Sequence, residues 1–138
     1  MNITVDTLKE LNACKSHVDL FEKTFPNGTT VTAESFDIAR NAGLNIFWLI
    51  EAMPALLAKN RSIFFGNPEW AYNCAGYIDK QPRDDTRAAA CKDPQWAYRY
   101  AVYIDKQPHS DTRAAACLDP RSARLYALYV DRKATWRH

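Results

Sequence analysis

The residue types that perform acid–base or nucleophilic chemistry are spread along this chain without a catalytic arrangement. Asp79, Asp105 and Asp131 recur at intervals of 26 residues. Acid–base pairs need carboxylates in different environments, whereas repeated units offer each carboxylate the same one. The three histidines share no spacing typical of a metal site or a general base, and no nucleophile elbow, phosphate-binding loop or zinc-protease motif occurs. The sequence therefore predicts no catalytic residue, no cofactor and no enzyme.

The four cysteines are further candidates for chemistry, but they form no CxxC pair. Cys91 and Cys117 stand 26 residues apart, and Phe65 occupies the same position one interval earlier. A position that accepts either cysteine or phenylalanine is typical of an apolar packing site. We therefore predict packing and no metal site, with a zinc or disulfide role as the alternative.

Residues suited to binding gather toward the C-terminal end of the sequence. Leu125 and Leu128 place two large apolar groups on one helix, and Trp136 follows them. The basic residues around them are Arg121, Arg124, Arg132, Lys133 and Arg137. An apolar patch with a basic rim is typical of a protein-binding surface. Two alternatives stay open: the apolar side chains pack within their own chain, or they join two copies in a homodimer.

These residues belong to a sequence that repeats every 26 residues. The run NPEWAYNCAGYIDKQPRDDTRAAAC from Asn67 returns as DPQWAYRYAVYIDKQPHSDTRAAAC from Asp93, and DPRSARLYALYVDRKATWRH begins a third time at Asp119. A period of this length is typical of stacked arrays, in which each repeat buries its apolar face against its neighbours. Such arrays usually serve as binding scaffolds, which also favours a binding protein over an enzyme.

Each repeat predicts a pair of helices. The first helix begins after an N-cap residue and a proline, and runs roughly twelve residues to the repeated aspartate. Pro82 and Pro108 then break the chain and can start a second helix, which carries the alanine-rich segment DTRAAAC. We expect the arginines of that segment, Arg87 and Arg113, to pair with aspartates of their own or the adjacent repeat.

On a helical wheel the first helix of a repeat has a packing face and a varied face. Ala71, Ala75 and Ile78 form a stripe that recurs in the later repeats, and small residues there let helices approach closely. The aromatic residues beside the stripe are expected to pack as well, including Tyr77 and its equivalents. The opposite face changes between repeats, so we expect a partner there and at the basic C-terminal end. The predicted partner-binding residues are Tyr72, Tyr98, Arg99, Arg121, Arg124, Leu125, Leu128, Arg132 and Trp136.

The first 60 residues are predicted to be helical, with one short irregular strip. Asp6 can cap a first helix, Thr32 begins and Gly43 ends a later one, and another runs over 45–53. The segments ITV and TTVT can pair as a minimal β-ribbon. The expected fold class is therefore all-α, with an N-terminal helical cap over 1–60 and a short array of helix-hairpin repeats over 61–138. The repeats lie near 67–92, 93–118 and 119–138.

Composition excludes several classes of protein. The chain is 47% hydrophobic and 25% charged, as in soluble globular proteins. It has no stretch of 18 apolar residues and no signal-peptide pattern, so we predict no membrane partner and a cytoplasmic location. Residues 1–60 carry five Lys/Arg and seven Asp/Glu, while residues 61–138 carry thirteen and nine. This mild positive excess favours an acidic partner but falls short of a nucleic-acid footprint.

The motif Asp/Asn-Pro-x-x-Ala-Tyr-x-Tyr-Ala, seen as DPQWAYRYA and in part as NPEWAYNCA, resembles tandem repeats in small bacteriophage and prophage proteins, most of them of unknown function. The segments TVDTLKELNACKSHVDLFEKTF and FWLIEAMPALLAK are similar to the N-terminal part found with such repeats. The third repeat departs from the pattern over 121–124, where it loses Trp-Ala-Tyr. The resemblance supplies no site residue.

This resemblance implies a phage origin and a host bacterial cytoplasm. It also implies that the chain binds and inhibits a host protein or protein complex, such as a CRISPR effector complex of the host defence. Two other functions remain open on the sequence. One is nucleic-acid binding, with arginines on phosphates and Tyr or Trp stacked on bases. The other is a structural or oligomeric phage component.

Overall fold

The computed structural model describes residues 2–132. The chain divides into two compact units, Met1–Phe64 and Phe65–His138, which we call the N-terminal unit and the array. The boundary lies four residues beyond the predicted end of the N-terminal region. Nearly all regular structure in the described residues is helical, and the strands are two residues long, so the predicted all-α fold class with helical repeats is confirmed.

The N-terminal unit starts with a short antiparallel ribbon, as predicted. Asn2 pairs with Thr30 and Ile3 with Thr29. Gly28 precedes the second strand with a φ of +78°, and a Cβ there would lie 2.7 Å from the Ile3 carbonyl oxygen. Only glycine permits both the positive φ and this close approach. The elements of this unit are β1 (Asn2–Ile3), α1 (Val5–Glu10), α2 (Lys15–Thr24), β2 (Thr29–Thr30), α3 (Ala33–Ala42), α4 (Ile46–Ala52) and α5 (Pro54–Phe64).

Capping residues determine where these helices begin and end. Thr32 caps α3 and Gly43 ends it in the left-handed region at φ 86°, both as predicted. The prediction that Asp6 caps α1 is wrong. Thr4 is the N-cap, because its hydroxyl accepts from Thr7 N–H while the Thr7 hydroxyl accepts from Thr4 N–H. Asp6 lies inside the first turn, where its charge still favours the helix dipole.

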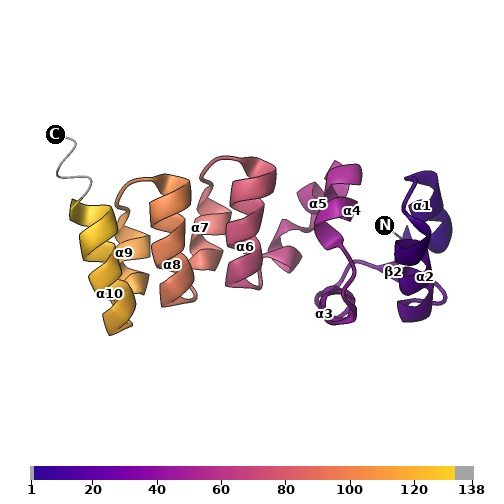
Figure 1. The fold of residues 1–138 in the computed structure, drawn as a ribbon, viewed down its shortest axis with the longest axis horizontal. Coiled ribbons are helices and arrows are strands. Elements are labelled where there is room, and N and C mark those ends of the chain that lie inside the picture. Colours follow the sequence, from indigo (N-terminus) through magenta and orange to yellow (C-terminus); the bar gives the residue numbers. More distant parts are fainter. Residues whose placement is uncertain (1, 133–138) are drawn as a thin grey trace. The chain divides into compact units, whose positions relative to one another are not determined.

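The array has two layers of helices (Figure 1). The first helices of the three repeats lie side by side in one layer, and the second helices of the first two repeats form the other. The elements are α6 (Pro68–Cys74), η1 (Ala75–Asp79), α7 (Asp84–Ala90), α8 (Pro94–Tyr100), η2 (Ala101–Asp105), α9 (Ser110–Ala116), α10 (Pro120–Tyr126) and η3 (Ala127–Asp131). The first, second and third repeats begin at Asn67, Asp93 and Asp119.

Each first helix changes its winding part-way. Seven α-helical residues are followed directly by five π-helical ones, so α6 with η1 has the length that the sequence predicts. The prediction that Pro82 and Pro108 start the second helices is wrong. Those helices begin two residues later, because Arg83 and His109 are the N-cap residues.

Tyrosine hydroxyls join neighbouring repeats. The fully buried Tyr100 hydroxyl lies 2.7 Å from Thr86 Oγ1 and accepts a 3.0 Å hydrogen bond from Arg83 N–H. Tyr126 repeats the arrangement on Thr112 and His109. A buried tyrosine hydroxyl needs a hydrogen-bond partner. In both cases the partner is the first turn of the second helix in the preceding repeat.

Ion pairs make a second link between repeats. Arg87 donates to both carboxylate oxygens of Asp105, at 3.0 and 2.6 Å, and also to Asp84. Arg113 pairs with Asp131 in the same way. The expected pairing of these arginines with aspartates of the adjacent repeat is confirmed. The hydrogen bonds and the coulombic attraction to Asp105 raise the pKa of Arg87, so this guanidinium keeps its charge at every physiological pH.

Burial of the alanine stripe follows the position of each repeat. Ala71, Ala75, Ala97 and Ala101 are fully buried, as predicted. Ala127, the equivalent of Ala75 and Ala101, is exposed, because no later repeat covers it within residues 2–132. The packing role predicted for cysteine fails at the same end: Cys117 is exposed, whereas Cys91 is half-buried.

Candidate functional site

A hollow of about 300 Å³ lies on the outer side of the array between α8 and α10. Four of the predicted binding residues line it: Tyr98, Arg99, Arg121 and Leu125. The other residues of its lining are Gln95, Asp119 and Ser122, which sequence reasoning did not select. The varied face of the first helices therefore contains a concave site made by two successive repeats.

N-caps and prolines position the rim of this hollow. Asp93 accepts from Gln95 N–H at 2.9 Å, which fixes the first turn of α8. Asp119 does the same for α10 by accepting from Ser122 N–H at 2.9 Å. This hydrogen bonding lowers the pKa of Asp119, so the carboxylate is ionised at neutral pH. Pro94 and Pro120 occupy the first helical turns, where a missing N–H does no harm.

Tyr98 forms part of the wall of the hollow and also packs inward. It lies against the buried cluster that includes Ala101, Ala116 and Tyr126, as does Val102. Burial raises the pKa of Tyr98 above its ordinary value, and the nearby phenols of Tyr103 and Tyr129 act in the same direction. Tyr98 and Val102 therefore pack within the array, although they lie on the varied face where a partner is expected. Both side chains are half-buried, because the cluster on which they pack includes Tyr126 of the next repeat.

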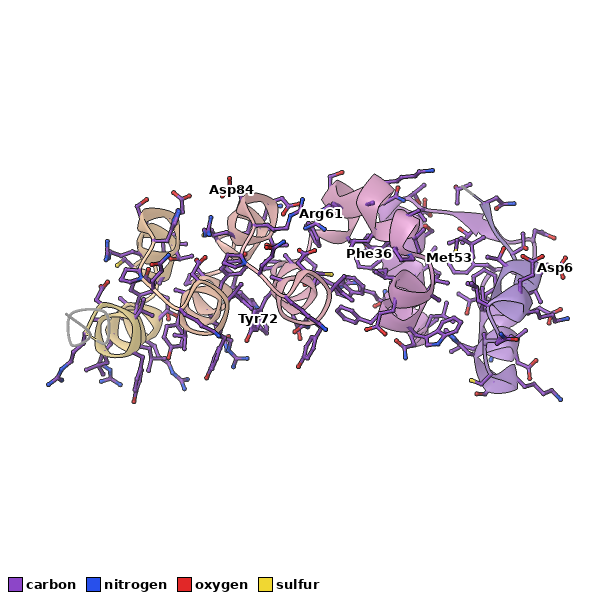
Figure 2. All side chains as sticks on the ribbon, turned by 90° about the horizontal axis from the view of Figure 1, so that it is seen from above. Asp6, Phe36, Met53, Arg61, Tyr72 and Asp84 are labelled. Carbon is purple, nitrogen blue, oxygen red and sulfur yellow. The ribbon has the colours of Figure 1, made fainter. Side chains whose placement is uncertain are left out.

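One repeat earlier, the equivalent groove is filled by an aromatic stack. The rings of Tyr72 and Trp96 lie 5.3 Å apart at 40°, and the Arg99 guanidinium carbon lies 4.9 Å from the Trp96 ring centroid. Figure 2 shows Tyr72 on the side of the array opposite Asp84, which belongs to the second layer of helices. Burial raises the pKa of Tyr72, while the charge of Arg99 opposes this rise. Tyr72 thus lies on the predicted face but is engaged with the chain itself.

The other predicted residues are spread over the third repeat. Arg124 is exposed on α10, and Leu128 is 42% exposed on η3. Arg132 follows η3, at the opposite end of this helix from Arg121, so these two arginines do not share one site. Trp136 lies outside the described residues. The structure therefore brings four of the nine predicted residues into one hollow and leaves Arg124 and Leu128 exposed on the same helix.

Three tyrosines expected to pack are instead exposed at equivalent positions. Tyr77, Tyr103 and Tyr129 are 68%, 60% and 48% exposed. Each lies in a π-helical segment, whose turn takes more residues than an α-helical turn. Residues after the transition are therefore rotated toward the outer face, away from the place that a uniform α-helical wheel assigns them. Their repetition was visible in the sequence, but the change of winding was not.

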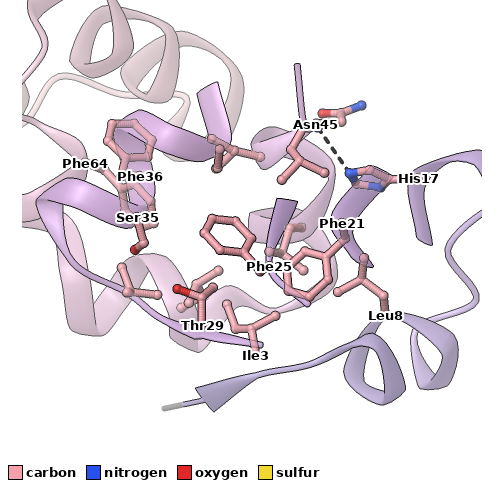
Figure 3. Close-up of a pocket in the computed structure, with 16 residues that line it drawn as sticks. Ile3, Leu8, His17, Phe21, Phe25, Thr29, Ser35, Phe36, Asn45 and Phe64 are labelled. Atoms are coloured by element: carbon pink, nitrogen blue, oxygen red, sulfur yellow. Dashed lines mark hydrogen bonds between the residues drawn. The ribbon is translucent and has the colours of Figure 1, made fainter. Parts of the chain in front are cut away.

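The N-terminal unit contains a separate apolar cavity of about 60 Å³ (Figure 3). Its walls include Phe21, Phe25 and Phe36. His17 borders it, where its Nε2 accepts a hydrogen bond from Asn45 N–H at 3.2 Å and its ring meets Trp48 edge-on. Burial lowers the pKa of His17, which favours the neutral ring. This histidine therefore has a packing role that explains its position.

The described residues offer no arrangement for metal or acid–base chemistry at the hollow. Residues 2–132 contain no cluster of three or more His, Cys, Asp or Glu able to hold a metal ion. Asp119 supplies the carboxylate of the lining, and as the N-cap of α10 it already accepts a hydrogen bond from Ser122 N–H. Over the same residues, no helix has the length and apolar character needed to cross a membrane. For binding, the lining of the hollow supplies an aromatic ring, an apolar side chain and two guanidinium groups.

Comparisons with protein-family models, with curated proteins and with solved structures give no match to this chain.

Proposed function

We propose that this chain is a non-catalytic protein-binding module that inhibits a system of its bacterial host. The observation that carries the proposal is the hollow between α8 and α10, formed by Tyr98, Arg99, Arg121 and Leu125. Tyrosine, tryptophan and arginine are the residue types that contribute most binding energy at protein interfaces. The exposed Tyr103, with its equivalents in the other repeats, extends this surface along the array.

The charge of the array favours an acidic partner. Residues 61–138 carry thirteen Lys/Arg against nine Asp/Glu, and Arg121 and Arg124 are exposed on α10. Complementary charge raises association rates and selects among partners more than it adds affinity. A phage origin and a target in host defence, such as a CRISPR effector complex, rest on the resemblance of the repeat motif to phage and prophage proteins.

The test is capture of a partner from a bacterial lysate on the immobilised full chain, with identification by mass spectrometry. We expect the triple variant Arg124→Ala, Leu125→Ala, Leu128→Ala to capture at least tenfold less of that partner. The matched control is Asp84→Ala with Lys92→Ala, which changes exposed residues at the two ends of α7 and should capture normally. Full capture by a folded triple variant would show that this surface is not the binding site.

Nucleic-acid binding is the second candidate, and the contact of Arg99 with Trp96 favours it. Arginine beside aromatic rings is a common arrangement on single-strand-binding surfaces. This function predicts retardation of short DNA or RNA strands at low salt and steep loss of binding as salt rises. If the chain retards neither single-stranded nor double-stranded nucleic acid at about 20–50 mM salt, the low end of the usual range, it does not bind nucleic acid.

Self-association is the third candidate, as a homodimer or a structural phage component. The exposed Ala127 and Leu128 at the third repeat are the observations that favour it. Light scattering of the pure protein distinguishes a monomer of 15.8 kDa from a dimer or a larger assembly.

A further inference from the structure

Two successive grooves of the array are built from equivalent positions, and among their differences the loss of one aromatic side chain matters most for binding. The groove between α6 and α8 contains Tyr72 and Trp96. A shift of 26 residues gives Tyr98 and Ser122 in the groove between α8 and α10. The tyrosine is thus kept in both grooves, whereas the tryptophan is replaced by serine in the second.

The first groove shows what this kind of site accepts. The Trp96 ring lies 5.3 Å from the Tyr72 ring, and the same ring packs on the buried cluster of Ala75, Ala90 and Tyr100. An aromatic pair at this separation and tilt is favourable beyond the burial of its area. The chain therefore supplies its own example of an indole seated against the tyrosine of the preceding helix.

The second groove lacks such a side chain. Ser122, the equivalent of Trp96, is buried, with 4% of its surface exposed, and its side chain is much smaller than an indole. The equivalent buried cluster, of Ala101, Ala116 and Tyr126, is covered here by Tyr98 and Val102. The hollow of about 300 Å³ borders this serine and the wall formed by Tyr98 and Leu125. Its volume is at the lower end of the range for sites that take small molecules or single side chains.

We propose that this hollow receives a tryptophan side chain of the partner protein, packed against Tyr98 as Trp96 packs against Tyr72. The inference rests on the proposed function, because it takes the partner to be a protein. Arg99 and Arg121 line the hollow together with Asp119, whose carboxylate is already bonded to Ser122 N–H. Two guanidinium groups against one carboxylate give the lining a net positive charge, which favours acidic residues beside the tryptophan of the partner.

The direct test is a titration of the full chain with two acetylated and amidated peptides, Gly-Glu-Trp-Glu-Gly and Gly-Glu-Ala-Glu-Gly. Amide chemical shifts are followed by NMR. We expect the tryptophan peptide to shift the resonances of Tyr98, Ser122 and Leu125, and the alanine peptide to bind at least tenfold more weakly. Equal binding of the two peptides, or shifts confined to other residues, would overturn the proposal.

The variant Ser122→Trp fills the hollow from within. The second repeat carries tryptophan at this position, so the variant should fold, and its melting temperature should rise by about 3 °C. It should bind the tryptophan peptide at least tenfold more weakly than the native chain. Ala114→Trp adds the same side chain on the exposed side of α9 and should bind the peptide normally. Unchanged binding by folded Ser122→Trp would contradict the proposal.

A second variant decides the matter if Ser122→Trp does not fold. Arg121→Glu changes an exposed residue of the lining and should weaken the acidic peptide at least fivefold, with little effect on folding. Undiminished binding would count against the proposal. Competition with an oligothymidine of eight nucleotides tests whether the hollow binds nucleic acid instead. Displacement of the peptide by the oligonucleotide would overturn the assignment to a protein side chain.

The failures of this inference and of the proposed function have different signatures. A lysate partner captured equally by the native chain and by Ser122→Trp supports the protein-binding function and overturns the tryptophan site. Selective binding of the tryptophan peptide without any captured host protein supports the site and counts against the host inhibitor.

Discussion

The carboxylate of Asp105 is buried between two repeats, with only 2% of its side chain exposed. A buried charge is costly unless it is paired and hydrogen-bonded. Arg87 meets this need with two hydrogen bonds, and its own side chain is 12% exposed. The equivalent pair one repeat later, Arg113 and Asp131, is 47% and 36% exposed. We therefore expect the buried arginine–aspartate pair between the first and second repeats to stabilise the fold differently from the exposed pair between the second and third.

We expect Arg87→Met to lower the free energy of unfolding by about 3 kcal/mol, because it leaves the Asp105 charge buried and unpaired. The matched variant Arg113→Met should cost about 1 kcal/mol or less, because water can solvate the exposed Asp131. Urea denaturation followed by circular dichroism measures both. Equal losses in the two variants would show that burial of the pair does not decide its contribution.

The cysteines differ in the ease with which they form thiolates. Cys14 is exposed, and its hydrogen bond with Ser16 lowers the pKa of its thiol. Burial raises the pKa of Cys91 from 9.0 to about 11. We expect iodoacetamide at pH 8 to modify Cys14 at least tenfold faster than Cys91, as measured by peptide mass spectrometry. In denaturant the two rates should converge; a persistent difference would mean that the fold is not its cause.

The raised pKa of Cys91 also predicts a loss of stability in alkaline solution. The folded state holds the thiol proton more tightly than the unfolded state, so this stabilisation is complete below pH 9.0 and is lost as the pH rises through about 11. The variant Cys91→Ala should show a shallower decline of unfolding free energy over this range. Parallel declines in the variant and the native chain would assign the effect to the tyrosines, such as Tyr100, whose pKa burial also raises.

Among the elements, the first helix of each repeat is distinguished by its change from α to π winding. The π-helical segments η1 and η2 are each followed by a lysine in the left-handed region, Lys80 at φ 56° and Lys106 at φ 57°. Glycine is the usual residue at such a helix end, because it has no Cβ to clash with the backbone. Both lysines therefore hold a strained conformation that the turn to the second helix requires.

We expect Lys106→Gly to stabilise the protein by up to about 1 kcal/mol, through relief of this left-handed strain. Lys92→Gly is the control, since Lys92 is equally exposed but does not have a positive φ. That change should be neutral or slightly destabilising because glycine increases the freedom of the unfolded chain. Thermal melts of both variants provide the comparison. A loss of stability in Lys106→Gly would show that the lysine side chain contributes more than the strain costs.

For the molecule as a whole, the array behaves as a stack in which each repeat is stabilised by its neighbours. Ala101 in the second repeat is fully buried, whereas Ala127 in the third is exposed. In such stacks stability is close to a sum of repeat and interface contributions. Opening the third repeat breaks one described interface, while opening the second breaks two.

Hydrogen exchange should therefore show a gradient along the array. We expect amides of η3 to exchange at least tenfold faster than those of η2, after correction for intrinsic rates, because the end repeat opens at lower cost. Mass spectrometry of peptic fragments from the native protein measures both segments. Equal protection would indicate that the array opens only as one cooperative unit.

Much of this structure could be predicted because it depends on neighbours in the sequence or on the period. Thr32 and Gly43 bound α3 through their own hydrogen bonds and dihedral angles. Arg87 pairs with Asp105 because the period brings the same two groups together wherever two repeats stack. The wrong cap prediction at Asp6 also concerns neighbours in the sequence. Thr4 is the N-cap because Thr4 and Thr7 together satisfy two backbone N–H groups.

The errors at the binding surface have a different origin. Tyr77 was placed by a uniform α-helical wheel, and the π winding after Cys74 rotates it outward. Tyr98 lies on the varied face, where the sequence predicts contact with a partner, but it is half-buried against a cluster that includes Tyr126 of the third repeat. The π winding recurs inside each repeat, but a uniform α-helical wheel does not include it. The burial of Tyr98 depends on how near the next repeat lies, which no single repeat contains.

The residues and their period are therefore enough to predict the all-α array, the N-caps of its first helices, its repeated ion pairs and the face on which a partner is expected. Only the tertiary structure decided which residues of that face remain accessible and where they enclose a space. The replacement of Trp96 by Ser122 is plain in the repeat, yet its consequence is a hollow between two helices. A hollow is space left by atoms of different repeats, so it exists only once those repeats are packed together.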